Sequence, residues 1–180
     1  MRSFGVVIAI ALLGAAGTEA VAQAPPKTRP APKLSEEKQA RWDKARAILA
    51  NPDLIELYSL DPNLLLEPEE KPKERFHGWE VLGKTVIKGA ETRKAVLAAA
   101  GTIKPGYGVR CFEPRHGIRA TAGGKTVDLV ICFHCDQVQV YFDKDNEDAR
   151  LPLTMDEDQK PGLDKVLTDA KILLPPPAKE

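Results

Sequence analysis

The sequence lacks an excess of charge of either sign. Its 180 residues carry 26 Lys and Arg against 26 Asp and Glu, so the formal net charge is zero. A protein whose main task is to bind nucleic acid or an anionic membrane needs a basic excess, because it must attract and neutralise phosphate groups. The balance predicts that nucleic acid is not a partner and leaves the partners otherwise unknown.

Long hydrophobic runs are also missing. The run from Phe4 to Ala16 is shorter than the ~20 residues that a membrane-spanning helix needs. Arg2 precedes this run, and the small residues Ala20 and Ala22 follow it, which is the pattern of a secretory signal peptide. We predict that residues 1–22 are a signal peptide. The protein is then exported, either periplasmic or secreted, and has no stable membrane span after cleavage.

The motifs of common catalytic sites are absent too. The sequence contains no G-x-S-x-G, H-E-x-x-H or phosphate-binding glycine pattern. His77 has no nucleophile or pair of carboxylates near it in the sequence, so it is predicted to be a structural histidine. These absences favour a protein that is not an enzyme.

Proline, in contrast, is frequent and divides the chain. Residues 23–33 are rich in proline and have no large apolar side chain, so they are predicted to form an extended linker. Residues 61–75 combine proline with many charges and are predicted to be an exposed loop. The remaining sequence, residues 34–175, has the length of a single domain.

Helix signals occur at three places. Ser35 can cap a helix over residues 35–50, and the alanine-rich residues 90–100 have high helix propensity. Pro161 can open a third helix over residues 161–172. Residues 54–60 are predicted to form a strand, and residues 76–87 are rich in β-forming residues.

The clearest strand signal surrounds Gly123-Gly124, a dipeptide that suits a two-residue hairpin turn. This turn places Ile118 opposite Leu129 on the neighbouring strand. Apolar residues alternate along the second arm and continue to residue 142 if a bulge lies near residues 136–137. We therefore predict an α+β fold, with an antiparallel sheet (hairpin 107–135 continuing to 142) packed by about three helices.

Cysteine is rare, with only three residues. If a bulge at Pro114 absorbs one residue, Cys111 lies opposite Cys135 on the same apolar face, within range of a disulfide. Cys132 then lies on the other face as the free thiol. The sequence predicts a structural disulfide between Cys111 and Cys135, which needs no cofactor.

Two other interpretations of these residues remain open. Cys111, His116, Cys132 and Cys135 are suitable ligands for zinc or another soft metal. The C-x-x-C motif of residues 132–135 also occurs in thiol-redox proteins, although here it follows an apolar strand pattern rather than the start of a helix. Separately, the basic residues around Gly117 could bind an anion; they are Arg110, Arg115, His116 and Arg119.

The strings FHGWEVLGKT (76–85), CFEPRHGIRA (111–120) and VDLVICFHCDQVQVY (127–141) resemble a family of small exported bacterial proteins of unknown function. The resemblance covers residues 76 to about 142 and implies no activity and no catalytic residue. The sequence thus predicts an exported, non-enzymatic domain with a structural, cysteine-bearing sheet. A Cys/His metal-binding or thiol-redox protein is the alternative.

Overall fold

The computed structural model describes residues 30–63, 74–107, 111–142 and 151–177. The described residues from Ala31 onward form one compact unit with an α+β fold, as predicted. The predicted signal peptide, most of the linker and residues 64–73 of the predicted loop lie outside the described residues. No helix within the described ranges has the length and apolar character to cross a membrane.

Helices occur close to where the sequence predicts them. Ser35 caps the first helix, its hydroxyl accepting a hydrogen bond from the Lys38 backbone N–H at 3.4 Å. Pro161 lies in the first turn of the third helix, which ends at Asp169, before the predicted residue 172. The helices of the described residues are α1 (Glu36–Ala50), α2 (Ala90–Gly101) and α3 (Lys160–Asp169), with the 3₁₀ helix η1 (Glu157–Gln159) before α3.

The described strands form one eight-stranded antiparallel sheet in the order β2-β3-β1-β5-β6-β7-β8-β4. Gly123 and Gly124 both have positive φ in the turn between β5 and β6, and Ile118 faces Leu129 as predicted. The strands are β1 (Leu54–Asp61), β2 (Arg75–Phe76), β3 (Trp79–Val86), β4 (Lys104–Pro105), β5 (His116–Ala122), β6 (Lys125–Cys132), β7 (Gln137–Phe142) and β8 (Leu153–Thr154).

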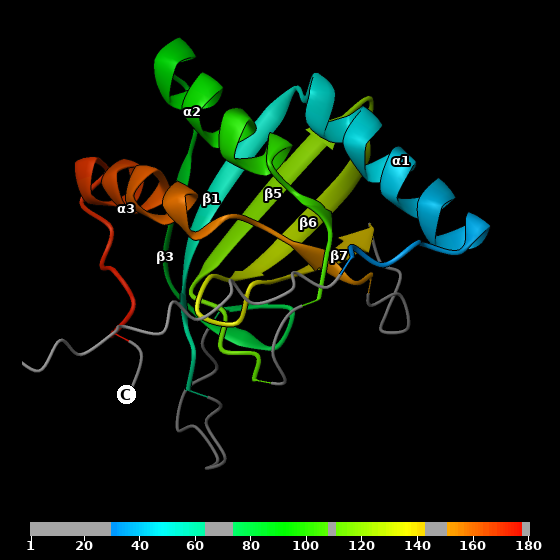
Figure 1. Cartoon of the computed structure of the whole chain (residues 1–180). Coiled ribbons are helices and arrows are strands. Elements are labelled where there is room, and N and C mark those ends of the chain that lie inside the picture. The colour runs from blue at the N-terminus through cyan, green and yellow to red at the C-terminus, as the bar shows by residue number, and fades with distance from the viewer. Residues whose placement is uncertain (1–29, 64–73, 108–110, 143–150, 178–180) are drawn as a thin grey trace, which may run out of the picture. The chain divides into compact units, whose positions relative to one another are not determined.

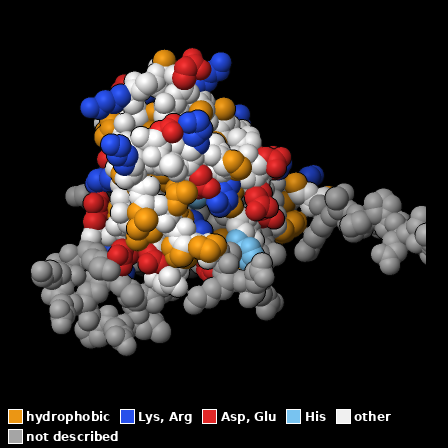
Figure 2. All heavy atoms as spheres, turned by 90° about the vertical axis from the view of Figure 1, so that its left-hand side faces the viewer, with side chains coloured by type: hydrophobic (Ala, Val, Ile, Leu, Met, Phe, Trp, Pro, Cys, Tyr) orange, Lys and Arg blue, Asp and Glu red, His pale blue; other side chains and the backbone are white. Residues whose placement is uncertain are grey.

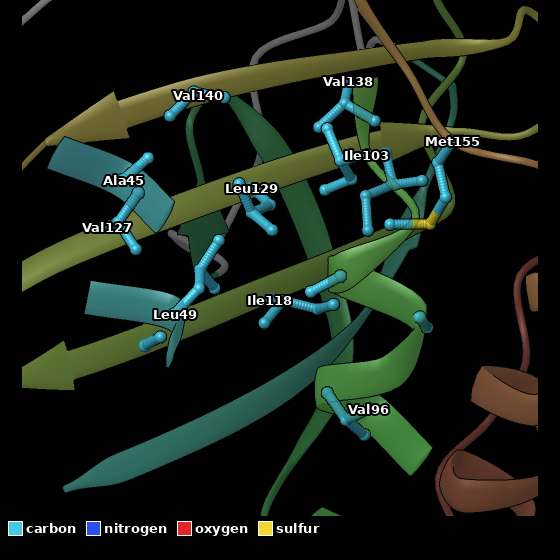
Figure 3. Close-up of a cluster of buried hydrophobic side chains, with 14 of the residues drawn as sticks. Ala45, Leu49, Val96, Ile103, Ile118, Val127, Leu129, Val138, Val140 and Met155 are labelled. Carbon is cyan, nitrogen blue, oxygen red and sulfur yellow. The ribbon is translucent and has the colours of Figure 1, made fainter. Parts of the chain in front are cut away.

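One face of the sheet is covered by the three helices (Figure 1). Every second residue of the central strands points toward these helices, as strand geometry requires. Figure 3 shows how Leu49 from α1 and Val96 from α2 approach Ile118, Leu129 and their neighbours. This packing forms the main hydrophobic core, which fixes the central strands on which the candidate site lies.

The opposite face carries a smaller cluster, which we call the aromatic cluster and which consists of Tyr58, Leu60, Phe76 and Val130. The rings of Tyr58 and Phe76 stack with their centroids 4.3 Å apart. Phe112 and Trp79 pack against the cluster and meet edge to face at 6.1 Å. Phe112 therefore anchors the segment that carries Cys111 to this face.

The first arm of the hairpin is shorter than predicted. β5 begins at His116, and residues 111–114 lie outside the ladder that joins β5 to β6, so the predicted bulge at Pro114 does not form within this strand. Pro114 has no N–H to donate to a neighbouring strand, which favours a strand start after it rather than before it. The prediction for residues 108–110 lies outside the described residues.

Candidate functional site

A tight turn separates β6 from β7, where the sequence predicted one strand with a bulge. β6 ends at Cys132, residues 133–136 form the turn, and β7 returns so that Gln137 pairs with Cys132. The Asp136 N–H donates to the Phe133 carbonyl at 3.2 Å, and Asp136 has a φ of 49°. The bulge prediction is wrong because the chain reverses direction, which brings both ends of the C-x-x-C motif to one place.

The three cysteines meet at this turn, and we call them the cysteine cluster. Cys132 and Cys135 form a disulfide pair with their Cα atoms 5.3 Å apart. The sulfur of Cys111 lies 2.9 Å from the sulfur of Cys135. The structure thus brings Cys111 and Cys135 together, as predicted, but pairs Cys135 with Cys132 and leaves Cys111 as the free cysteine.

The reversal at residues 133–136 explains this difference. A continuous strand would place Cys132 and Cys135 on opposite faces, whereas the turn rotates Cys135 back toward the end of β6. The pairing assigned from sequence depended on the continuous strand.

Exposure separates the members of the cysteine cluster. Cys111 is exposed, whereas Cys132 and Cys135 are 1% and 0% exposed. Two contacts hold the segment of Cys111 in place: Phe112 packs on the aromatic cluster, and the Arg115 N–H donates to the Ile131 carbonyl at 3.1 Å. The cluster therefore combines one accessible thiol with a buried disulfide.

His116, a predicted metal ligand, is engaged elsewhere. Its Nε2 lies 2.8 Å from Asp164 Oδ1 on α3, and its Nδ1 is buried without a hydrogen-bond partner among the described residues. Burial lowers the pKa of His116, so the ring is neutral near pH 7. Burial raises the pKa of Asp164, but hydrogen bonds from His116 and Lys160 outweigh this effect and lower the pKa overall. The Asp164 carboxylate therefore accepts a hydrogen bond from the Nε2–H group of His116.

The structure does not assemble the predicted set of metal ligands. His116 and Cys132 point to opposite faces of the sheet, His116 toward α3 and Cys132 in the row of Val130. Within the described ranges, no group of three or more His, Cys, Asp or Glu side chains has the arrangement of a metal site.

The predicted anion-binding residues are separated in the same way. Arg115 donates to the carbonyls of Glu113 and Pro176, and His116 bonds Asp164. Arg119 points to the other face, where its guanidinium binds both carboxylate oxygens of Asp128 at 2.8 Å and 2.6 Å. Arg110 lies outside the described residues.

A polar network on the aromatic face was missed by the sequence analysis. His77 Nε2 lies 2.7 Å from Asp128 Oδ2, and the His77 ring stacks on Tyr141 at 3.8 Å. Burial raises the pKa of Asp128, yet its bonds to Arg119 and His77 lower it overall. Arg119 and Asp128 are direct partners in the predicted hairpin register, so this pair could have been found. His77 could not, because it comes from the turn between β2 and β3.

Comparison of the chain with protein-family profiles, curated proteins and solved structures found no match. The resemblance to a family of small exported proteins therefore stays a prediction.

Proposed function

We propose that this protein is an exported thiol–disulfide exchange protein in which Cys111 is the reactive thiol and Cys132–Cys135 is the internal disulfide. The observation that carries the proposal is the 2.9 Å distance between the sulfurs of Cys111 and Cys135. Exchange requires a cysteine sulfur next to a disulfide sulfur, and this distance supports such an arrangement. An oxidising compartment suits it, which agrees with the predicted signal peptide.

The proposed reaction transfers two electrons from the reduced protein to a client disulfide. The Cys111 thiolate attacks one client sulfur, so a mixed disulfide forms and the first client thiol leaves. Cys135 then attacks the Cys111 sulfur, which forms the Cys111–Cys135 bond and releases the second client thiol.

Cys132 completes the sequence. Its thiolate attacks Cys135, the Cys132–Cys135 bond forms, and Cys111 leaves as a thiolate that takes up the proton lost by Cys132. The net change is one client disulfide reduced to two thiols and one protein dithiol oxidised to a disulfide. The reverse sequence oxidises a client dithiol.

The different exposure of the three cysteines supports the order in which they react in this scheme. Cys111 is exposed and can meet a client, whereas Cys132 and Cys135 are almost completely buried and can react quickly only through Cys111. The bridge between Cys111 and Cys135 that the sequence predicts is an intermediate in this scheme.

The test follows fully reduced protein mixed with glutathione disulfide. Wild type is expected to release both glutathione thiols, and Cys111→Ser is expected to react at least roughly tenfold more slowly, because its remaining thiols are buried. Cys135→Ser should stop at glutathione attached to Cys111. Cys132→Ser should stop at the Cys111–Cys135 bridge.

A control is Glu37→Gln, which changes one charge at an exposed position of α1 and should keep the wild-type rate. If Cys111→Ser reacts as fast as wild type, the cysteines have the structural role that the sequence favoured. Stoichiometric zinc bound to all three thiols would instead support the metal-binding alternative. Either outcome contradicts the exchange proposal.

A further inference from the structure

A cavity lies beside the turn that carries the disulfide. Its volume is about 220 Å³, and it is bounded by the turn, by the start of α3 and by the C-terminal segment, residues 172–177. Phe133 and His134, the two residues between Cys132 and Cys135, form part of its wall. A ligand in this cavity would touch the turn that holds the internal disulfide.

The C-terminal segment is held over this side of the molecule. Ser59 Oγ donates to the Leu173 carbonyl at 2.6 Å, and Arg115 Nε donates to the Pro176 carbonyl at 2.9 Å. Figure 2 shows the face on which α3 and this segment lie, with hydrophobic side chains gathered among acidic and basic ones. Leu174 and three prolines give the cavity an apolar side.

Arg115 is a buried cation on the polar side of the cavity. The residue is 7% exposed, and two of its hydrogen bonds go to the neutral carbonyls of Pro176 and Glu113. Within the described part of the chain, it reaches one carboxylate, that of Glu113, at 3.6 Å with a half-exposed side chain. This ion pair is longer than a hydrogen bond, so the buried guanidinium can take an additional carboxylate at closer range.

Three other charged residues line the cavity: Lys160 and Asp164, which pair with each other at 2.6 Å, and Glu157. Glu157 lines the cavity, is exposed and can accept an ammonium group. The volume lies below the ~300 Å³ of the smallest pockets for drug-sized molecules, so the ligand has to be small. A carboxylate, an ammonium group and a compact apolar part describe an amino acid.

Arg115 also links the cavity to the reactive thiol. Its Nη1 donates at 3.1 Å to the carbonyl of Glu113, two residues after Cys111. A ligand carboxylate on Arg115 would therefore lie near the segment of Cys111, while its apolar part contacts Phe133. The cavity is thus lined by Arg115, on the segment of Cys111, and by Phe133 and His134, between the two cysteines of the disulfide.

We propose that the cavity binds a small amino-acid disulfide of the cystine type, with its carboxylate on Arg115 and its ammonium group near Glu157. This inference rests on the proposed exchange function and names its substrate class. The client disulfide is reduced to two amino-acid thiols, while the protein gains the Cys132–Cys135 bond.

The test compares two disulfides that differ only in the carboxylates: L-cystine and cystamine. Reduced wild type is expected to react with cystine at least roughly tenfold faster than with cystamine. One charge-assisted hydrogen bond to the carboxylate is enough to produce a rate ratio of this size. The rate with cystine should saturate, and that with cystamine should stay linear in concentration.

Two variants separate binding from chemistry. Arg115→Gln removes the cation and should abolish the preference for cystine. Leu174→Trp fills the cavity without changing a charge, so it should remove saturation by cystine. Because Arg115 also holds the C-terminal segment, the Leu174 variant keeps the test valid if Arg115→Gln fails to fold.

Equal wild-type rates with the two disulfides would overturn this inference and leave the exchange function standing. If wild type reacts with neither disulfide, the exchange function fails instead. In that case, calorimetry tests cystine binding without the reaction, on a protein whose three cysteines are replaced by serine. Binding that Leu174→Trp abolishes supports the cavity as the cystine site, and the absence of binding contradicts it.

Discussion

At the scale of single residues, the aromatic face depends on the missing side chain of Gly117. A Cβ at this position would lie 2.7 Å from Phe76 Cε1 and 3.3 Å from Tyr58 Cβ. Phe76 is almost fully buried, so its ring has little room to move away. The stack of Tyr58 and Phe76 requires glycine here.

We expect Gly117→Ala to destabilise the protein by about 1–3 kcal/mol, the usual effect of overpacking a filled site. Urea unfolding followed by circular dichroism measures the change. Gly101→Ala is the matched control, because its Cβ would meet no atom within 4 Å, and it should be neutral or slightly stabilising. Equal effects of the two substitutions would contradict the assigned role of Gly117.

His116 predicts a pH dependence of stability. Burial lowers its pKa from the usual 6.5, so the unfolded chain takes up the proton at a higher pH than the folded protein does. Its contribution is complete above about pH 6.5 and is lost as the pH falls through the folded pKa. Asp128 and Asp164, whose pKa values are lowered from 3.8, lose their contributions in a more acidic range.

The melting temperature of wild type should therefore fall as the pH is lowered from about 6.5 toward about 4.5, where the aspartates are still ionised. His116→Gln can still donate to Asp164 but does not titrate, so its melting temperature should change less over this range. His134→Gln, at an exposed position, should retain the wild-type dependence. The same pH slope for wild type and His116→Gln would rule out the buried imidazole as its source.

At the scale of elements, the C-terminal segment is fixed by two strands of the sheet. Ser59 on β1 donates to the Leu173 carbonyl, and Ile172 packs over Gly83 on β3, where a Cβ would lie 2.8 Å from Ile172 Cγ2. Lys171 has a φ of 59°, which ends α3 and turns the chain toward these strands. The position of the segment thus depends on side chains far away in the sequence.

Ser59→Ala removes a buried donor and should lower the free energy of unfolding by about 1 kcal/mol. Amide hydrogen exchange of residues 172–174 should become faster. Ser35→Ala, which removes the α1 cap, is the control: its effect on stability is similar, at about 1 kcal/mol, but residues 172–174 should exchange as in wild type. Unchanged exchange in Ser59→Ala would show that this hydrogen bond does not hold the segment.

The same scale explains what the sequence could predict. The Gly123-Gly124 turn set the register of β5 and β6, because only glycine takes positive φ at both turn positions without strain. The turn at residues 133–136 has no glycine or proline, and Phe133 and Cys135 continue the apolar alternation of β6. Asp136 accepts a positive φ more readily than most residues, which is a weak signal beside that alternation.

The site was harder to predict than the fold. The sequence analysis missed the turn at residues 133–136 and therefore assigned Cys111, not Cys132, as the disulfide partner of Cys135. A shift of one position along a strand moves a side chain to the other face of the sheet. The contacts of His77 with Asp128 and of His116 with Asp164 join elements about 50 residues apart, and no local pattern encodes them. Hairpin register is local information, whereas these contacts depend on tertiary packing.

At the scale of the whole molecule, the main core and the cysteine cluster lie at different places on the sheet. The helices cover one face with the main core, and the aromatic cluster covers part of the other (Figure 1). The cysteine cluster lies where β6 ends and β7 begins, held from one side by Phe112 and from the other by Phe133. A rigid core of this kind holds the sulfurs at a fixed distance, which thiol–disulfide exchange requires.

The order of reaction at the three sulfurs tests the exchange function most directly. Reduced wild type is mixed with glutathione disulfide, quenched with acid at increasing times, and mapped by alkylation before and after reduction. We expect glutathione on Cys111 first, and then a final state with Cys132 and Cys135 bridged and Cys111 free. A final state with Cys111 bridged to Cys135 and Cys132 free, never preceded by glutathione on Cys111, would contradict it.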